Sequence, residues 1–280
     1  MNRQTDRLSV EKIRGQGPKE IFNEVAQKHD ISVQNISNVI FDTLKEKFPN
    51  LEFRFRRSLE KNEINKKLNE VDARLGVTIF LENASIIPDG GIIEVKDNQG
   101  KWRIVLVSEA KHQGKDIENI GKGILVGKNK NQELMAAGNA IERSHKNINE
   151  IRNMMIDEKH FPYVLFLQGS NFITEPITVT RPNGSEVVLY PNNGTLNRID
   201  RLTSANYSLP INQNCCENID ISIDGQSVML QAVSIYAKAT EWTIEEMFII
   251  LLDVSLTSLR IIGLTQTVPV SKISLRLPDS

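Results

Sequence analysis

Apolar and polar residues alternate along residues 91–111 in a pattern that predicts a β-hairpin. The alternation runs through 91–96, breaks at Asp97-Asn-Gln-Gly100, and resumes through 102–111. Successive strand residues point to opposite faces, so Glu109 and Lys111 are expected to share one face of the second strand. This hairpin therefore carries an acid and a lysine side by side.

A third charged residue, Asp89, precedes the hairpin. A plain two-residue turn at Asn98-Gln99 would place Asp89 opposite Ser108, facing away from Glu109. One extra residue in the turn, or a bulge, would bring Asp89 across from Glu109 on the same face. Gly90-Gly91 suits a bulge. We therefore predict a bulge or bend there.

Periodicity elsewhere predicts helices alternating with short strands. The expected helices cover 18–29, 33–48, 59–71, 134–155, 195–206 and 243–253. The expected strands cover 51–55, 77–81, 163–167, 177–180, 186–190 and 228–236, with a strand-like remainder after 253. Residues 1–17 lack periodicity and are expected to form a flexible arm. The pattern indicates a single α/β domain over 18–280, with excursions at about 112–134 and as a hairpin at about 174–192.

Composition indicates a globular protein but does not indicate its function. The 280 residues are 40% hydrophobic, enough for a sizeable core, and the net charge of −1 gives no sign of a polyanionic partner. Locally, residues 111–130 hold five lysines against Asp116 and Glu118. A basic segment in a neutral protein can still bind a polyanion, because nearby charges dominate under screening.

The cysteines and the apolar runs point to the cytoplasm. Cys215 and Cys216 are adjacent, which makes a poor structural disulfide and favours a reducing compartment. Residues 1–14 are too polar for a secretory signal, and the longest apolar run, 247–252, is too short to span a bilayer. We expect a soluble cytoplasmic protein with no membrane partner.

Asp89, Glu109 and Lys111 form the candidate catalytic set. Two carboxylates can hold a hard divalent cation such as Mg²⁺, and a lysine can steady an attacking water or a phosphate oxygen. The alternative is a simple turn at Pro88-Asp89-Gly90 and a solvated Glu–Lys pair. A two-carboxylate glycosidase would give Lys111 no natural role.

Residues 135–143 form a second candidate site. The periodicity favours an amphipathic helix with Glu142 and Arg143 on its polar face. The alternative is that Gly138 interrupts the helix, so that Asn139 reads adenine edges in a DNA major groove while Glu142 and Arg143 support the base contacts. Arg198 and Arg201 share one helical face and suit either surface ion pairs or contacts with phosphate and guanine. Lysines within 115–130, among them Lys115 and Lys128, suit a solvated face or a clamp on a phosphate backbone.

Five ordered segments together resemble the EcoRI family of type II restriction endonucleases. They are IPDGGIIEVK (87–96), SEAKHQGKD (108–116), MAAGNAIERSHKN (135–147), FPYVLFL (161–167) and LNRIDRLT (196–203). The similarity runs in order from about residue 20 to 262, which makes it far more specific than any one motif.

The resemblance implies the PD-(D/E)xK nuclease fold, a central mixed five-stranded sheet flanked by helices, with arms that embrace DNA. It implies a homodimer on palindromic double-stranded DNA, with Asp89 and Glu109 as Mg²⁺ ligands and Lys111 positioning the water. It places residues 112–134 in an inner arm and starts a helix near Ala140, after an extended segment in the major groove. The DNA-binding residues it implies are Met135, Ala136, Ala137, Gly138, Asn139, Glu142, Arg143, Arg198, Arg201, Lys115, Lys128, Lys146 and Gln113.

The resemblance further suggests GAATTC as the target, cut to leave 5′-phosphate overhangs, and a cognate DNA methyltransferase in the host. The sequence departs from the family pattern at Arg57, Pro191 and Thr195, which bears on accessory contacts rather than chemistry. Two alternatives remain: a structure-selective repair nuclease of the same fold, and a sequence-specific DNA-binding protein without catalysis.

Overall fold

A five-stranded mixed sheet forms the centre of the protein. The structure is a computed structural model that describes residues 24–77, 84–114, 116–124, 140–191 and 193–266, without side-chain detail for 24–32, 140–143 and 193–198. The strands occur in the order β1 (Phe53–Arg56), β4 (Gly91–Lys96), β5 (Trp102–His112), β6 (Tyr163–Gln168) and β11 (Ser234–Lys238). The strands β1, β4 and β5 pair antiparallel, whereas β5, β6 and β11 pair parallel. The predicted mixed α/β sheet is confirmed.

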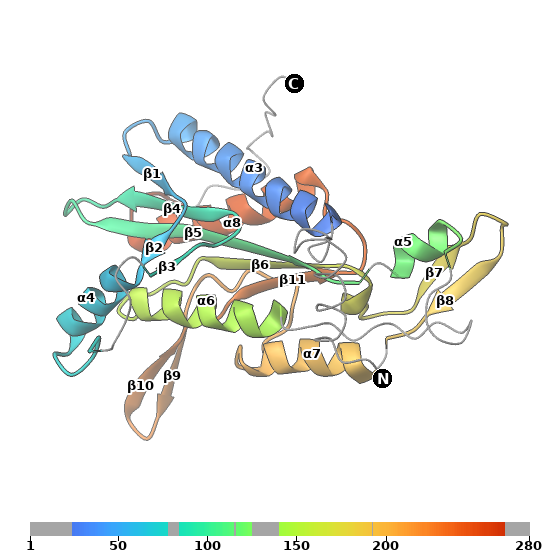
Figure 1. Cartoon of the computed structure of the whole chain (residues 1–280). Coiled ribbons are helices and arrows are strands. Elements are labelled where there is room, and N and C mark those ends of the chain that lie inside the picture. The colour runs from blue at the N-terminus through green and yellow to red at the C-terminus, as the bar shows by residue number, and fades with distance from the viewer. Residues whose placement is uncertain (1–23, 78–83, 115, 125–139, 192, 267–280) are drawn as a thin grey trace.

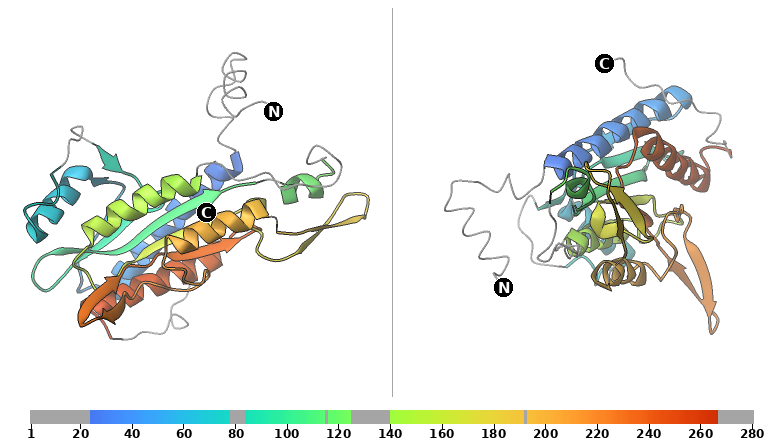
Figure 2. Two further views of the ribbon diagram at one scale, coloured as in Figure 1. Left: turned by 90° about the horizontal axis from the view of Figure 1, so that it is seen from below. Right: turned by 90° about the vertical axis from the view of Figure 1, so that its right-hand side faces the viewer.

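Helices cover both faces of the sheet (Figures 1 and 2). On one face lie α3 (Glu24–Lys47) and α8 (Ile244–Ile262), packed on a core that includes Ile93, Leu106 and Phe166. On the other face lie α4 (Lys61–Val71), α6 (Ala140–Met154) and α7 (Asn193–Ser204), over a core that includes Val107 and Leu165. Burial of these two apolar layers is the main force that holds the sheet between its helices.

The hairpin of β4 and β5 contains two irregularities rather than the single one predicted. Its turn has three residues, because the Asp97 N–H donates to the Lys101 carbonyl at 2.8 Å. Farther along, the register shifts between Ile93 and Glu94, which leaves Val105 as an extra residue on β5. The strict alternation expected along 102–111 is therefore interrupted at the bulge. Ile104 lies in the core layer under α4, α6 and α7, whereas Val105 and Leu106 both lie in the layer under α3 and α8.

The helices α3 and α8 are longer than the sequence predicts. The helix α3 runs without interruption through the break expected near residue 30, where neither Pro nor Gly interrupts it. The helix α8 begins after the N-cap Thr243 and continues past Asp253 to Gly263, which adopts a φ of +82°. A left-handed glycine is a common helix stop. The strand-like interpretation of residues 254–262 was wrong.

The predicted strand 228–236 is two strands that belong to different sheets. The hairpin of β9 (Ile219–Ile223) and β10 (Gln226–Leu230) projects from the body, and β11, the edge strand of the central sheet, begins only at Ser234. A further small sheet pairs β2 (Leu59–Glu60) with β3 (Ser85–Ile86). The expected strand at 77–81 lies almost wholly outside the described residues.

The two predicted excursions meet one another at one end of the sheet. The hairpin of β7 (Ile177–Thr180) and β8 (Glu186–Leu189) is confirmed, and the short helix α5 (Asp116–Gly121) lies beside it (Figure 1). Ile120, Val179 and Leu189 share a small buried cluster with Ile173, which follows the 3₁₀ turn η1 (Ser170–Phe172). The described parts of the two arms therefore support each other.

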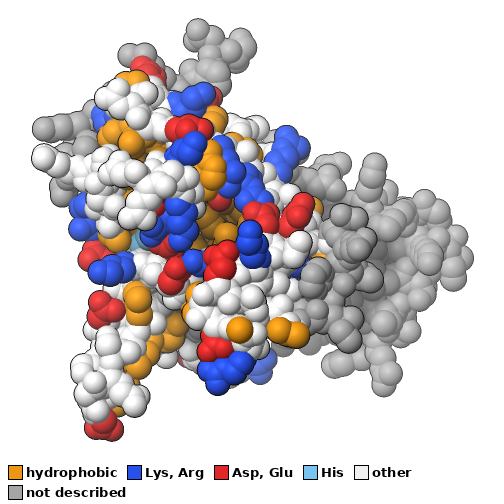
Figure 3. Space-filling model, turned by 90° about the vertical axis from the view of Figure 1, so that its left-hand side faces the viewer, with side chains coloured by type: hydrophobic (Ala, Val, Ile, Leu, Met, Phe, Trp, Pro, Cys, Tyr) orange, Lys and Arg blue, Asp and Glu red, His pale blue; other side chains and the backbone are white. Residues whose placement is uncertain are grey.

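Positive and negative side chains are intermingled on the opposite end of the molecule, around α4 and the β4–β5 turn (Figure 3). Lys67 pairs with Asp157 at 2.5 Å, and Arg103 contacts both Asp97 and Glu158. Such neutralised pairs make this end a poor surface for a polyanion. In the part of the chain that the structure describes, no helix is long and apolar enough to cross a membrane.

A buried histidine beneath the hairpin makes stability depend on pH. Nε2 of His160 lies 2.9 Å from the Ile104 carbonyl, and burial lowers the pKa of His160 from 6.5 to about 4. Between those values the unfolded chain binds a proton that the folded chain does not, so stability is lost as pH falls through this window. In His160→Gln, which keeps an N–H donor, we expect that loss to be smaller by up to about 3 kcal/mol. Urea unfolding at pH 7.5, 5.5 and 4.5 measures it, and parallel profiles would contradict the assignment.

Candidate active site

A tight turn before β4 places Asp89 beside the end of β5. The Gly91 N–H donates to the Pro88 carbonyl at 3.0 Å, and Gly91 adopts a φ of +82°. The turn directs Asp89 at the neighbouring strand, where its Oδ2 accepts from the Ala110 N–H at 3.2 Å. The predicted bend is therefore present at Gly90-Gly91, while the bulge lies farther along the hairpin. The pairing of β4 with β5 extends only to Gly91 and does not include Asp89. The turn, rather than the strand register, therefore sets the direction of the Asp89 side chain.

Lys111 joins the two carboxylates. Its Nζ lies 2.5 Å from Oδ2 of Asp89 and 2.8 Å from Oε1 of Glu109. Burial alone would lower the pKa of Lys111, but the charges of Glu109 and Asp89 together outweigh it and raise that pKa. The lysine is therefore a cation held between two anions, and the structure brings the three residues of the candidate set together.

Two further residues hold Glu109, whose side chain is 1% exposed. The Tyr163 hydroxyl donates to Oε2 of Glu109, and Nδ2 of Asn147 lies 3.3 Å from Oε1 and 3.2 Å from Oε2. Sequence reasoning missed both residues. A tyrosine within the apolar strand 163–167 was the available signal, because a buried tyrosine hydroxyl usually needs a partner.

The site suits a hard divalent cation. Oδ2 of Asp89 and Oε1 of Glu109 already converge on one positive charge, the ammonium of Lys111. Mg²⁺ is commonly bound by one or two carboxylates, with water and substrate phosphate oxygens completing its coordination. The described residues contain no group of three or more His, Cys, Asp or Glu that could hold a metal. A cation here would leave room for other oxygen ligands.

The residues expected to bind DNA are only partly described. Met135 to Asn139, Lys115 and Lys128 lie outside the described residues. Glu142 and Arg143 occupy the first turn of α6, and Arg198 lies in α7, all without described side chains. Lys146 and Arg201 are exposed, on α6 and α7 respectively, and Gln113 is partly buried just beyond β5.

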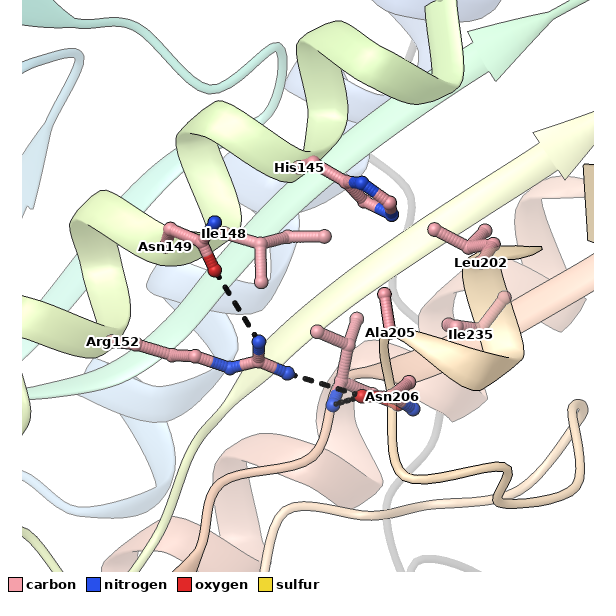
Figure 4. Close-up of a pocket in the computed structure, with 9 residues that line it drawn as sticks. His145, Ile148, Asn149, Arg152, Leu202, Ala205, Asn206 and Ile235 are labelled. Atoms are coloured by element: carbon pink, nitrogen blue, oxygen red, sulfur yellow. Dashed lines mark hydrogen bonds between the residues drawn. The ribbon is translucent and has the colours of Figure 1, made fainter.

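A small pocket of about 60 Å³ separates α6 from α7 (Figure 4). Arg152 crosses it from α6: its Nε donates to the Gln231 carbonyl at 2.9 Å, and Nη2 donates to Oδ1 of Asn206 at 3.3 Å. The guanidinium also lies 5.7 Å from the ring centroid of Phe161 and 5.5 Å from that of Tyr207. Arg152 therefore ties the C-terminal half of α6 to the segment after α7, through Asn206, and to the segment before β11, through Gln231.

Arg152→Ala should cost about 2–3 kcal/mol of unfolding free energy, because it leaves the Gln231 carbonyl and the Asn206 amide without their charged donor. Arg260→Ala is the matched control, since Arg260 makes a more exposed ion pair with Glu217. An exposed pair of this kind is worth at most about 1 kcal/mol. Urea unfolding of both variants measures the difference, and equal losses would show that Arg152 is only a surface residue.

Comparison with known proteins agrees with this geometry. The family model for restriction endonuclease EcoRI matches residues 15–267. The chain is 54% identical over 263 residues to the type II restriction enzyme EcoRI of Escherichia coli, covering 93% of this chain and 95% of that protein. It is also 54% identical over 257 residues to the type II restriction enzyme RsrI of Cereibacter sphaeroides, covering 92% and 93% of the two chains. This chain therefore belongs to the EcoRI family of restriction endonucleases, enzymes that use a divalent metal ion.

Proposed function

We propose that this chain is a type II restriction endonuclease that cuts both strands of DNA in a Mg²⁺-dependent reaction. The observation that carries the proposal is the convergence of Asp89 and Glu109 on the Nζ of Lys111. Type II restriction enzymes with 54% identity along almost the whole chain support the same activity.

In the proposed reaction, Asp89 and Glu109 would hold the metal through their carboxylate oxygens. When bound, the ion would supply charge neutralisation at the phosphate and would lower the pKa of the attacking water. Lys111 donates hydrogen bonds from its ammonium, which orient the attacking water and stabilise charge on the phosphate oxygens. The water oxygen attacks phosphorus in line and gives up a proton to solvent. The P–O3′ bond breaks, the 3′ oxygen takes up a proton from solvent to become a hydroxyl, and the phosphate remains on the 5′ end.

Specificity is proposed to come from the segment 135–143 with Arg198 and Arg201. The similarity of this segment to the family suggests GAATTC as the palindromic target. A palindrome matches a two-fold homodimer, in which each subunit reads one half-site and cuts one strand. Bidentate contacts to base edges are each worth about 1–3 kcal/mol of discrimination. Lys115, Lys128, Lys146 and Gln113 are proposed to contact the phosphate backbone.

The cell that makes such an enzyme must protect its own DNA, so we propose that a cognate DNA methyltransferase accompanies it in the cytoplasm. The rivals are a structure-selective nuclease and a DNA-binding protein without catalysis. The carboxylate–lysine cluster argues against loss of catalysis, and the names of both relatives argue against structure-selective cutting.

Digestion of a plasmid of known sequence, with and without MgCl₂, tests the proposal. We expect discrete fragments with Mg²⁺ only, and sequenced termini that fall within GAATTC with 5′ overhangs. Random nicking, or cutting at branched junctions alone, would contradict sequence-specific cleavage. Retardation of DNA without cutting at any Mg²⁺ concentration would favour the binding protein. Light scattering on the free and DNA-bound enzyme tests the homodimer separately.

A further inference from the structure

The two oxygens of Glu109 have different surroundings. Oε1 lies 2.8 Å from Nζ of Lys111, the same atom that contacts Asp89. Oε2 accepts from the hydroxyl of Tyr163, and Nδ2 of Asn147 lies between the two oxygens, 3.3 Å from Oε1 and 3.2 Å from Oε2. Oε1 therefore faces the space shared with Asp89, while Tyr163 fixes Oε2 and Asn147 holds both oxygens.

Tyr163 cannot readily change its position. Its side chain is fully buried, and its ring stacks on that of Phe161 with centroids 5.9 Å apart and planes 17° apart. The buried, stacked ring therefore holds the hydroxyl in place as a donor to Oε2 of Glu109.

Asn147 approaches the same carboxylate from α6, which is fastened on both sides. Nζ of Lys61 lies 2.5 Å from Oε1 of Glu150, which ties α6 to the start of α4. Arg152 ties α6 to Gln231 and Asn206. The amide of Asn147 is thus presented to Glu109 by a helix whose place is set by its neighbours on two sides.

We propose that Tyr163 and Asn147 are positioning residues that hold Glu109 so that its Oε1 faces the metal site. Tyr163, a residue of the central sheet, sets the orientation of the Glu109 carboxylate. Because Asn147 belongs to α6, that orientation also depends on the position of α6. This inference rests on the proposed function. Because the first turn of α6 carries Glu142 and Arg143, Asn147 also offers a physical link between DNA recognition and the metal ligand.

Tyr163→Phe tests the first half of the inference, because it removes only the donor and keeps the stacked ring. Residues that orient metal ligands typically contribute about 10- to 100-fold in metal affinity. We expect the dissociation constant for Mn²⁺, followed by electron paramagnetic resonance of the free ion with the protein alone, to rise by that factor. The Mg²⁺ concentration for half-maximal cleavage should rise similarly, with DNA affinity in the absence of metal unchanged. Tyr236→Phe is the matched control, since Tyr236 is a buried tyrosine on the opposite face of the same sheet.

Asn147→Ala tests the second half, with Asn153→Ala as its control at an exposed position of the same helix. The hydrogen bonds from Asn147 to Glu109 are long, so we expect a rise of about tenfold in the Mn²⁺ dissociation constant, at the low end of the same range. Asn153→Ala should match the wild type.

The outcomes separate the inference from the proposed function. Mn²⁺ binding and Mg²⁺ dependence equal to the wild type in both Tyr163→Phe and Asn147→Ala would overturn the positioning role. Equal shifts in Tyr163→Phe and Tyr236→Phe, or in Asn147→Ala and Asn153→Ala, would show a general structural effect and overturn it as well. A wild-type protein that binds Mn²⁺ but never cuts DNA would refute the proposed function while leaving the positioning result readable.

Discussion

Glu109→Ala is expected to abolish cleavage while leaving tight, site-specific DNA binding. The substitution removes one of the two carboxylates that converge on Lys111. Stabilisation by a bound metal is worth several kcal/mol, and each 1.4 kcal/mol or so changes the rate tenfold. We therefore expect the single-turnover rate to fall at least about a thousandfold. The residues that we propose to contact bases and phosphates are others, so we expect the affinity for the target to remain.

Glu109→Gln provides the isosteric companion, because its amide oxygen can still accept from Tyr163. It should be as inactive as Glu109→Ala but more stable, since a buried hydroxyl without an acceptor costs about 1–3 kcal/mol. Glu245→Ala, an exposed change on α8, controls for general loss of charge. Single-turnover cleavage and gel retardation on one target duplex measure both properties. Retained cleavage in either Glu109 variant would remove Glu109 from the catalytic set.

The hairpin and the shared face of Glu109 and Lys111 were predictable because alternation along a strand is a local signal. That Asp89 lies close to Glu109 and Lys111 was predictable, but how the chain brings it there was not. Val105, the residue that bulges out of register, is as good a strand former as its neighbours, so nothing local marks it. The three-residue turn and the bulge together shift the pairing of β4 with β5 by two residues, where one was expected. The turn at Pro88 then directs the Asp89 side chain towards the end of β5.

The support around Glu109 was not predictable from local pattern. Tyr163 is 54 residues away in sequence and Asn147 is 38 residues away. Parallel pairing of β5 with β6 brings the Tyr163 hydroxyl next to the Glu109 carboxylate. Packing of α6 on the same face of the sheet brings the Asn147 amide next to it as well. Both contacts depend on tertiary structure. The end of α8, by contrast, was signalled in the sequence by Gly263, a common helix stop. An interpretation based on periodicity alone does not take such a glycine into account.

Gly90→Ala is expected to damage both stability and catalysis, because Gly90 sits where a side chain has no room. A Cβ at Gly90 would lie 2.0 Å from Oγ of Ser108, 2.7 Å from Cγ1 of Val33 and 2.8 Å from Oγ of Ser37. Overpacking of this kind typically costs about 1–3 kcal/mol. Relief requires the turn to move away from α3, which carries Asp89 with it. A displacement of about 1 Å at a reacting group can cost about a hundredfold in rate.

A second substitution tests whether this steric contact is the cause. Oγ of Ser108 is the nearest atom and lies 2.8 Å from Oγ of Ser37, which also donates to the Val33 carbonyl at 2.8 Å. Ser37 therefore keeps a partner in Ser108→Ala, and we expect that single variant to remain active. Combined with Gly90→Ala it should recover part of both the unfolding free energy and the cleavage rate, which a double-mutant cycle resolves. Strict additivity of the two changes would show that the turn fails for another reason. Recovery would establish that the close contact of Gly90 with Ser108 of β5 sets the position of the first carboxylate.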